Sequence, residues 1–244
     1  MSRLMMAVYV PKRYFILGGL LLLHIVIGIL ALDYWLDYRQ EQKVLATGAQ
    51  VILDPGHGGV DPGALWGDVK EKDIVLDVVQ RMRQYLEENG YSVVLTRDAD
   101  VDLGGELSPG RHRRDLQARL QVINQGQVAV SVHCNTIEDQ SQRGAVVFYQ
   151  KGSAEGERLA ASLLAELNKV QLLNDNRPLP RENLFLLRTS RIPTVIVELG
   201  FLSNPEDRHK LLEPGFRQQL AEAMSRGIIN YLAQNALSST TRWL

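Results

Sequence analysis

The stretch VILDPGHGG, residues 51–59, decides the fold that we predict for this chain. Its apolar start is typical of a short buried strand, and its glycines permit a tight turn that brings the backbone close to a ligand. Two later apolar runs end in the same manner, because VAVSVH closes on His133 and TVIVE closes on Glu198. Open α/β sheets bind their ligands at the carboxyl ends of the strands. We therefore expect His57, His133 and Glu198 to lie close together.

Short apolar runs alternate with amphipathic stretches from Gln50 onward. This alternation predicts an α/β fold, with a single twisted, mostly parallel sheet and helices on both of its faces. We expect a long polar loop at 98–115. The expected strands cover residues 51–53, 91–96, 128–133, 144–150, 183–187 and 194–198, and the expected helices cover 71–89, the stretch around 116–123, 153–170 and 216–231.

The composition indicates one sizeable globular domain, because 45% of the 244 residues are hydrophobic and 23% are charged. The net charge of −1 gives no electrostatic reason to expect a nucleic-acid partner. Cys134 is the only cysteine, so no intrachain disulfide can form. A large core does not need disulfides, and an extracellular location therefore stays open.

The segment 15–32 is apolar apart from His24. As a helix it would be roughly 27 Å long at about 1.5 Å per residue, which is enough to cross the hydrocarbon core of a bilayer. Basic residues precede the segment and acidic residues follow it, so the positive-inside rule places the N-terminus in the cytoplasm. The flanking charges are Arg3, Lys12 and Arg13 before the segment and Asp33 and Asp37 after it.

These features predict a single-pass protein of the cell membrane. A cleaved signal peptide is the alternative, and it would release a secreted form. The globular domain is expected outside the cytoplasm in both cases. We expect a cytoplasmic N-terminus at 1–14, a transmembrane anchor at 15–32, a polar stalk at 33–49, an extracytoplasmic catalytic domain at 50–236 and a tail at 237–244.

The polar residues at the strand ends have the chemistry of a zinc site. Two imidazoles and a carboxylate suit a catalytic zinc ion with one open position, and a second carboxylate beside them supplies the base that hydrolysis needs. Glu71, at the start of the first helix-like stretch, is the fourth candidate. A hydrogen-bonded core without a metal is the alternative, in which each buried histidine and carboxylate has a protein partner.

Three other residues are weaker candidates for metal binding. His112 and His209 lie in strongly charged stretches that are typical of solvated positions. Cys134 follows His133 on a predicted strand, where neighbouring side chains point to opposite faces, so the two should not share one metal ion. We expect Cys134 to be a small buried side chain.

Four motifs of the chain resemble the zinc-dependent N-acetylmuramoyl-L-alanine amidases of the amidase-3 type, which hydrolyse peptidoglycan. They are DPGHGG at 54–59, EKD at 71–73, SVHCN at 131–135 and VELGFLSN at 197–204. The resemblance runs in order from about residue 51 to residue 232, and it implies a parallel-rich α/β sheet flanked by helices. It also implies that one Zn²⁺ is bound by His57, Glu71 and His133, that Glu198 is catalytic, and that Asn135, Arg97 and Arg119 contact the substrate.

The reaction that this resemblance implies is hydrolysis of the amide bond between N-acetylmuramic acid and L-alanine. Within the family, the chain is most similar to the membrane-anchored, germination-specific amidases of spore-forming bacteria. This similarity implies a role in spore cortex maturation, where muramic-δ-lactam forms, or in cell-wall remodelling. Peptidoglycan is the expected partner, and an unidentified protein activator or the 98–115 loop is the expected route of any regulation.

Two functions of other classes stay open at this point. A zinc peptidase or carboxypeptidase that acts on cell-wall stem peptides would use the same metal ligands. A catalytically silent, membrane-anchored peptidoglycan-binding protein is the second alternative, and it would be expected to lack a ligand or the second glutamate. The chain retains all four residues.

Overall fold

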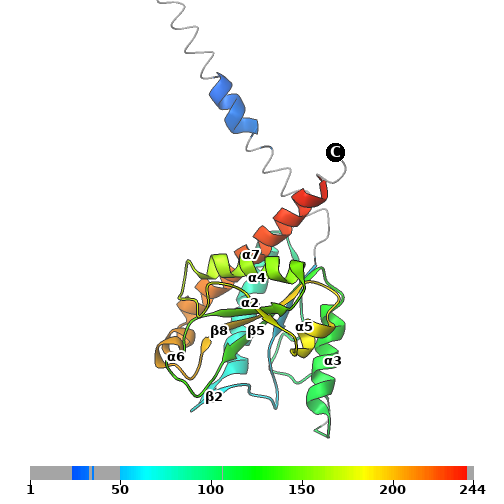
Figure 1. The fold of residues 1–244 in the computed structure, drawn as a ribbon, viewed down its shortest axis with the longest axis vertical. Coiled ribbons are helices and arrows are strands. Elements are labelled where there is room, and N and C mark those ends of the chain that lie inside the picture. Colours follow the sequence, from blue (N-terminus) through cyan, green and yellow to red (C-terminus); the bar gives the residue numbers. More distant parts are fainter. Residues whose placement is uncertain (1–23, 33–34, 36–49, 106, 241–244) are drawn as a thin grey trace, which may run out of the picture. The chain divides into compact units, whose positions relative to one another are not determined.

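The computed structural model describes residues 24–32, 35, 50–105 and 107–240 (Figure 1). The chain divides into two compact units, and the second of them, residues 47–244, holds every strand described below.

The first unit, residues 1–46, contains a helix over residues 24–32 with exposed apolar side chains. Among the described residues, no helix combines the length and the apolar character that crossing a bilayer requires. The predicted anchor at 15–32 starts outside the described residues, and so do the predicted cytoplasmic segment and most of the stalk.

A six-stranded sheet forms the centre of the second unit, in the order β4-β1-β5-β8-β6-β7. The first four of these strands are parallel, β6 runs antiparallel to β8, and β7 is parallel to β6. The predicted α/β fold with a mostly parallel sheet is therefore confirmed. The strands are β1 (Gln50–Pro55), β4 (Ser92–Leu95), β5 (Val128–Asn135), β6 (Val146–Gln150), β7 (Leu179–Arg181) and β8 (Thr194–Phe201).

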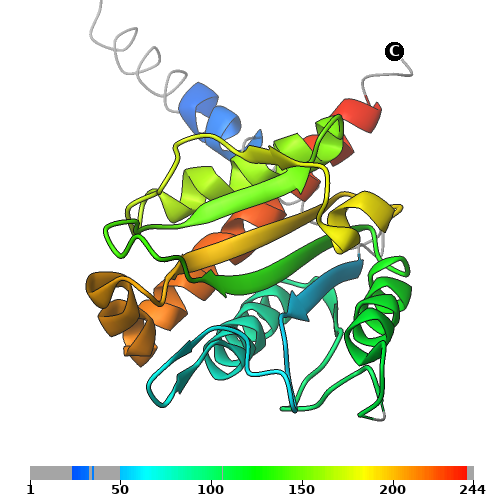
Figure 2. The ribbon, with the colours of Figure 1, turned by 60° about the horizontal axis from the view of Figure 1, so that its bottom comes forward.

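Helices cover both faces of this sheet, as Figure 2 shows. Two long helices pack on one face, a third long helix packs against both of them, and two shorter helices pack on the other face beside β1 and β8. A further helix, α6 (Pro205–Leu212), follows β8 directly. The long helices are α2 (Glu71–Glu88), α4 (Ala154–Leu167) and α7 (Pro214–Thr240), and the shorter ones are α3 (Arg111–Ile123) and α5 (Phe185–Thr189).

Helix α2 forms because its apolar residues recur at helical spacing on one face. Burying each such side chain contributes about 1.5–3 kcal/mol, which fixes the helix on the sheet. Gly90 follows the helix with a φ of 83°, a conformation that suits glycine at a helix end. The buried face consists of Ile74, Val75, Val78, Val79, Met82 and Leu86, as the spacing predicted.

The prediction of a strand at 183–187 is wrong, because the helix α5 occupies Phe185–Thr189. Its two buried leucines face different clusters: Leu187 packs with Phe148 and Phe201, and Leu186 packs with Ile52. A short apolar run fits a strand and a helical turn equally well, and here the three-dimensional packing selects the helix.

The predicted polar loop at 98–115 is wrong in its last five residues, which are helical. Helix α3 begins at Arg111, earlier than expected, although its first turn is charged. An ion pair between Asp115 and Arg119, one turn apart, supports this part of the helix. At the other end of the chain, α7 continues to Thr240, so 237–240 of the predicted tail are helical.

Four short elements had not been expected. The edge strand β7 pairs with β6, and a hairpin of β2 (Leu65–Trp66) and β3 (Val69–Lys70) precedes α2. Helix α6 is capped by Asn204, whose side-chain oxygen accepts hydrogen bonds from the N–H groups of Glu206 and Asp207. An asparagine before a proline at the first helical position is a start signal that the sequence does contain.

A buried carboxylate joins the sheet to α3 beneath the carboxyl ends of the strands. Asp54 of β1 is fully buried and accepts hydrogen bonds from Thr96, Ser131 and Arg119 at 2.5, 2.6 and 2.7 Å. Burial alone would raise the pKa of Asp54, but the charge of Arg119 and these hydrogen bonds hold that pKa below its usual value. The carboxylate therefore stays ionised inside the protein.

Removing this carboxylate should destabilise the domain. In the variant Asp54→Ala the guanidinium of Arg119 loses one of its buried partners, and we expect the free energy of unfolding to fall by about 3 kcal/mol or more. Urea denaturation of the full chain measures this loss. The control is Glu87→Ala, an exposed carboxylate on α2, which should change stability by less than about 0.5 kcal/mol. Equal losses for the two variants would contradict the role given to Asp54.

Candidate metal and catalytic site

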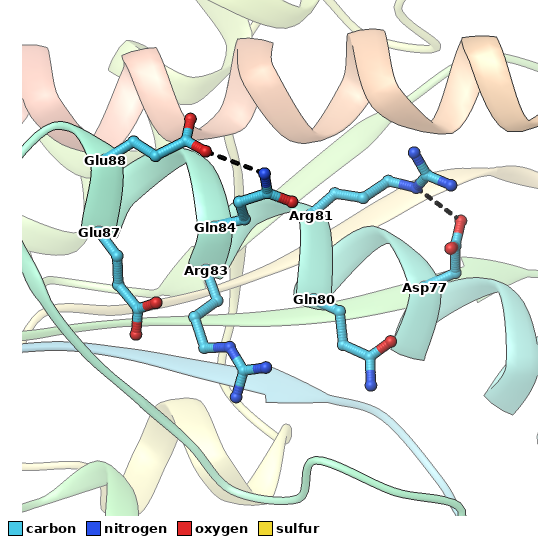
Figure 3. A pocket seen from close by; sticks show the side chains of 7 residues that line it. All are labelled: Asp77, Gln80, Arg81, Arg83, Gln84, Glu87 and Glu88. Carbon is cyan, nitrogen blue, oxygen red and sulfur yellow. Dashed lines mark hydrogen bonds and ion pairs between the residues drawn. The ribbon is translucent and has the colours of Figure 1, made fainter.

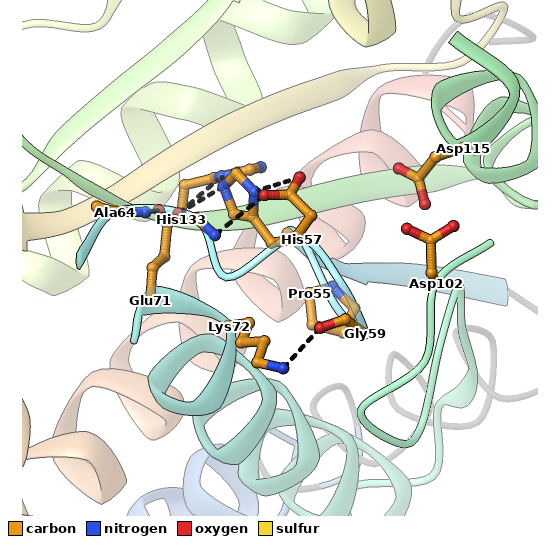
Figure 4. A network of polar contacts seen from close by, with 12 residues as sticks. Pro55, His57, Gly59, Ala64, Glu71, Lys72, Asp102, Asp115 and His133 are labelled. Carbon is orange, nitrogen blue, oxygen red and sulfur yellow. Dashed lines mark hydrogen bonds and ion pairs between the residues drawn. The ribbon is translucent and has the colours of Figure 1, made fainter. Parts of the chain in front are cut away.

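Three side chains with metal-binding atoms converge at the carboxyl edge of the sheet (Figure 4). His57 follows β1, His133 lies near the end of β5, and Glu71 is the first residue of α2. His133 Nδ1 lies 2.9 Å from Glu71 Oε1 and 3.2 Å from His57 Nε2, and His57 Nε2 lies 3.1 Å from Glu71 Oε1. The residues that the sequence analysis selected as ligands thus lie together.

These separations suit a tetrahedral metal ion. Zinc–ligand bonds of about 2.0–2.1 Å place the ligand atoms of a tetrahedral site about 3.3 Å apart. The two imidazole rings are nearly perpendicular, with an interplanar angle of 83°, so their nitrogen atoms approach one point from different directions. Two imidazole nitrogens and one carboxylate oxygen leave one position of a tetrahedron open.

The electrostatics of this cluster favour a cation. Burial alone would lower the pKa of His57, but its hydrogen bonds to Glu71 and Asp61 and their charges raise it to about 9. Burial alone would raise the pKa of Glu71, yet His133 and His57 hold it well below its usual value. The cluster therefore stabilises positive charge next to an ionised carboxylate.

The conformation of the His57 loop depends on a glycine. A Cβ atom on Gly56 would overlap the His133 ring, lying 2.6 Å from both of its nitrogens. His57 itself has a φ of 60°, in the left-handed region that residues other than glycine rarely adopt. Its Nδ1 lies 3.0 Å from the Asp61 carboxylate, which orients the ring so that Nε2 faces Glu71.

Arg97 and Arg119, which the resemblance places as substrate contacts, are buried beneath this loop. Arg97 donates hydrogen bonds to the carbonyl oxygens of Pro55 and Gly56 at 3.0 and 2.7 Å. Arg119 donates to the carbonyl oxygens of Pro55 and His57 at 2.7 and 2.6 Å. Both guanidinium groups therefore hold the protein's own backbone, and we assign them a structural role in place of substrate contact.

Asn135 and Glu198 lie beside the metal-binding cluster. Asn135 ends β5 and is half-buried. Glu198 of β8 pairs in register with His133, and its Oε2 atom is buried with no hydrogen-bond partner among the described residues. Burial raises the pKa of Glu198 to about 7, and the charge of Glu71 acts in the same direction, although those of His133 and His57 oppose it. An unpartnered carboxylate of this kind is suited to exchange a proton with a bound molecule.

Sequence reasoning missed the residues that support the ligands. Asp61 lies four residues after His57 and begins the sequence Asp-Pro-Gly, which is typical of a tight turn. Lys72 donates hydrogen bonds to the Gly59 carbonyl and to Asp100, both at 2.7 Å, and so ties α2 to the His57 loop (Figure 4). The two Lys72 contacts join segments that are separated in the sequence, which is why the pattern of residues did not predict them.

The weaker candidates lie where the sequence predicted. His112 and His209 are exposed, and neither belongs to the metal-binding cluster of the described residues. Cys134 is buried, and its backbone N–H donates a hydrogen bond of 2.9 Å to Glu71 Oε1. Its contribution to the site is therefore made by the main chain.

A separate hollow lies along the outer face of α2 (Figure 3). Its side chains are polar and partly paired with one another, as in the contacts Arg81–Asp77 and Gln84–Glu88, both 2.9 Å long. None of its residues belongs to the metal-binding cluster. The chemistry of the site therefore lies at the sheet edge and not in this hollow.

Comparison with known proteins agrees with this geometry. Residues 51–230 match the family model described as N-acetylmuramoyl-L-alanine amidase. The germination-specific N-acetylmuramoyl-L-alanine amidase of Bacillus subtilis (strain 168) is 37% identical over 194 residues, which cover 77% of this chain and 81% of that protein. The amidase AmiC of Neisseria meningitidis is 29% identical over 233 residues, but the match covers only 53% of its length.

Solved structures show the same fold. The CwlD amidase from Clostridioides difficile, solved in complex with the GerS lipoprotein, has a TM-score of 0.71 and 33% identity, over 76% of this chain and 99% of that one. The amidase AmiC2 of Nostoc punctiforme has a TM-score of 0.66 and 32% identity, over 76% and 97% of the two chains. With its sheet, its converging ligands and these matches, the chain belongs to the N-acetylmuramoyl-L-alanine amidase family.

Proposed function

We propose that this protein is a zinc-dependent enzyme that hydrolyses the amide bond between N-acetylmuramic acid and L-alanine in peptidoglycan. Membership of the amidase family supports the reaction. The observation that carries the mechanism is the convergence of His57, Glu71 and His133 beside the unpartnered carboxylate of Glu198.

His57, Glu71 and His133 would hold the zinc ion, because their donor atoms and spacing fit a tetrahedral site with one open position. When bound, zinc acts as a Lewis acid that polarises a carbonyl oxygen and lowers the pKa of water. Arg97 and Arg119 hold the backbone of the His57 loop from beneath, and so keep that ligand in place.

Glu198 is the catalytic base in this proposal. Its Oε2 accepts a proton from the attacking water, while the water oxygen bonds to the carbonyl carbon of the muramic lactyl group. Glu198 then delivers the proton to the nitrogen of L-alanine as the carbon–nitrogen bond breaks. The products are a free muramic carboxylate and a stem peptide with a free amino terminus. Asn135, at the end of β5, is the proposed contact to the substrate.

The biological setting follows from the relatives. The similarity to a germination-specific amidase of Bacillus subtilis supports a role in the spore cortex, where peptide removal precedes muramic-δ-lactam formation. The related CwlD amidase was solved with a lipoprotein bound, which supports a protein activator for this chain as well. Remodelling of the vegetative cell wall is the alternative setting for the same reaction.

We also propose that residues 15–32 anchor the protein in the cell membrane with the catalytic domain, 50–236, outside the cytoplasm. The support is the apolar length of this segment and the basic residues before it. The protein should stay with the membrane of intact spheroplasts, and protease added from outside should digest its catalytic domain. A protein recovered in the medium would indicate the cleaved, secreted form instead.

Mass spectrometry of digested peptidoglycan tests the reaction. The zinc-loaded protein should release stem peptides that begin with L-alanine and leave glycan strands with free muramic carboxylates. Chelation should abolish this release and added zinc should restore it. Shortened stems that stay attached to glycan would show a peptidase in place of an amidase, and peptidoglycan binding without any product would show a silent binding protein.

Glutamine substitutions should separate the two glutamates of the site. Glu198→Gln removes the base but no proposed ligand, so kcat should fall by about 10²–10⁴-fold while the zinc content stays near one ion per chain. Glu71→Gln removes a ligand, so zinc and activity should be lost together. Metal analysis beside rate measurements distinguishes them, with the exposed Glu213→Gln as control. Loss of zinc from Glu198→Gln would contradict the role of Glu198 as base.

A methyl group on Gly56 should disturb the metal site without unfolding the domain. In Gly56→Ala the new Cβ displaces the His133 ring, and we expect zinc affinity to fall by about 10- to 100-fold, as for other changes that misorient a ligand. Zinc titration and circular dichroism measure the two properties. Gly215→Ala is the control, because a Cβ there meets no atom within 4 Å. Unchanged affinity in Gly56→Ala would rule out this contact.

A further inference from the structure

An arginine and a tryptophan form a cation–π contact between α6 and the β2–β3 hairpin. The guanidinium carbon of Arg208, on α6, lies 4.5 Å from the centre of the Trp66 ring, on the β2–β3 hairpin. This separation is within the range of a cation–π contact. Trp66 is 36% exposed and its hairpin neighbour Leu65 is 54% exposed, so the pair lies at the surface and not in the core.

Each partner belongs to a segment that is hydrogen-bonded close to a residue of the proposed site. Two residues before Trp66, the Ala64 N–H donates a hydrogen bond of 2.7 Å to Glu71 Oε2, which ties the hairpin to a proposed metal ligand. Arg208 Nη1 donates a hydrogen bond of 2.6 Å to the carbonyl oxygen of Leu202, just after the strand that carries Glu198. Figure 2 shows the hairpin and α6 at the same end of the sheet.

Most of the hydrogen-bonding capacity of Arg208 is unused. A guanidinium has five N–H donors, and among the described contacts Arg208 donates only to Leu202. The neighbouring carboxylates are engaged elsewhere, because Asp207 accepts hydrogen bonds from the N–H groups of Gly144 and Phe201, and Glu206 pairs with Arg143. Arg208 is therefore a partly exposed cation that is held by one hydrogen bond and by its contact with Trp66.

Such a group suits one class of ligand. A guanidinium held over an aromatic ring can present its remaining donors as a fork, which matches the two oxygens of a carboxylate. The proposed substrate carries free carboxylates on its stem peptide. The muramic carboxyl of the glycan is not free before cleavage, because it forms the amide bond to L-alanine. Charge and geometry therefore both favour the peptide side of the scissile bond.

We propose that Arg208, positioned by Trp66, binds a carboxylate of the peptidoglycan stem peptide and so selects substrates with free carboxylates. This inference rests on the proposed amidase function and adds a specificity-determining residue to it. Arg208 does not take part in bond cleavage, so its loss acts on KM and not on kcat.

Kinetics on a matched pair of substrates test this proposal. One substrate is a muramoyl peptide with free stem carboxylates, and the other is the same peptide with those carboxylates converted to primary amides. For the wild-type full chain, KM should be about tenfold lower for the free peptide, the effect of one hydrogen-bonded charged pair. Arg208→Gln should raise KM for the free peptide to the value for the amide, with kcat unchanged.

Further variants separate recognition from structure. Arg208→Lys keeps the charge but loses the fork, so its KM should be intermediate. Trp66→Ala should raise KM for the free peptide. Trp66→Phe keeps an aromatic ring for the contact with Arg208, so its KM should stay close to the wild-type value. Lys210→Gln removes a charge from an exposed position on the same helix and should leave both KM values unchanged. Thermal unfolding of each variant shows whether it is folded.

The outcomes are distinct. Equal KM values of the wild-type protein for the two peptides would overturn the carboxylate subsite while leaving the amidase function standing. The carboxylate subsite would also be overturned if Arg208→Gln still had a lower KM for the free peptide, or if Lys210→Gln lost this difference in KM. Failure of the wild-type protein to cleave either peptide would instead overturn the proposed function, and the subsite with it. If Arg208→Gln does not fold, the KM values of the wild-type protein and of the two Trp66 variants still test the carboxylate subsite.

Discussion

Two buried guanidinium groups fix the backbone on which the site is built. Arg97 and Arg119 approach the carbonyl oxygens of residues 55–57 from below, and each spans at least two of them. Hydrogen bonds from a charged donor are stronger than neutral ones, and a buried guanidinium that loses its acceptors is costly. The loop therefore cannot relax away from the strained conformation at His57 without leaving charge unpaired in the interior. The position of a proposed metal ligand is thus set by groups that never reach the surface.

The carboxylates of this region carry out different tasks because their surroundings differ. Asp54 is fully buried but stays ionised, since Arg119 and two hydroxyl groups compensate its charge. The Oε2 atom of Glu198 is buried without such donors, and the pKa of Glu198 rises to about 7. One environment yields a permanent anion that holds the fold together, and the other yields a group ready to take up and release a proton. Asp54 lies on β1 and Glu198 on β8, the two parallel strands that flank β5.

The sequence predicted the parts of this protein that depend on short-range pattern. Apolar runs located β1, β5 and β8, and the rule that ligands bind at the carboxyl ends of strands brought His57, His133 and Glu198 to one edge. The stripe from Ile74 to Leu86 predicted α2 and its buried face. These features follow from periodicity along the chain, which is visible without a structure.

Features that depend on packing between distant segments could not be read in this way. The run at 183–187 has no local preference strong enough to select a strand or a helix, and its two leucines are placed by separate clusters. The resemblance placed Arg97 and Arg119 as substrate contacts, but the direction of these side chains is set by carbonyl groups some 40 and 60 positions earlier in the chain. The capping asparagine of α6 was a local signal that a closer reading of the sequence would have detected.

The antiparallel course of β6 has a consequence for how this fold can be elaborated. Because β6 lies against β8 in the opposite direction, the connection from β5 to β6, residues 136–145, begins and ends at the edge where the proposed catalytic groups lie. A parallel strand in that place would need a crossover to the far end of the sheet. Here the chain can be lengthened between β5 and β6 without altering the register of either strand with β8. Evolution or protein engineering could therefore add a cover over the proposed active site at this connection and leave the core unchanged.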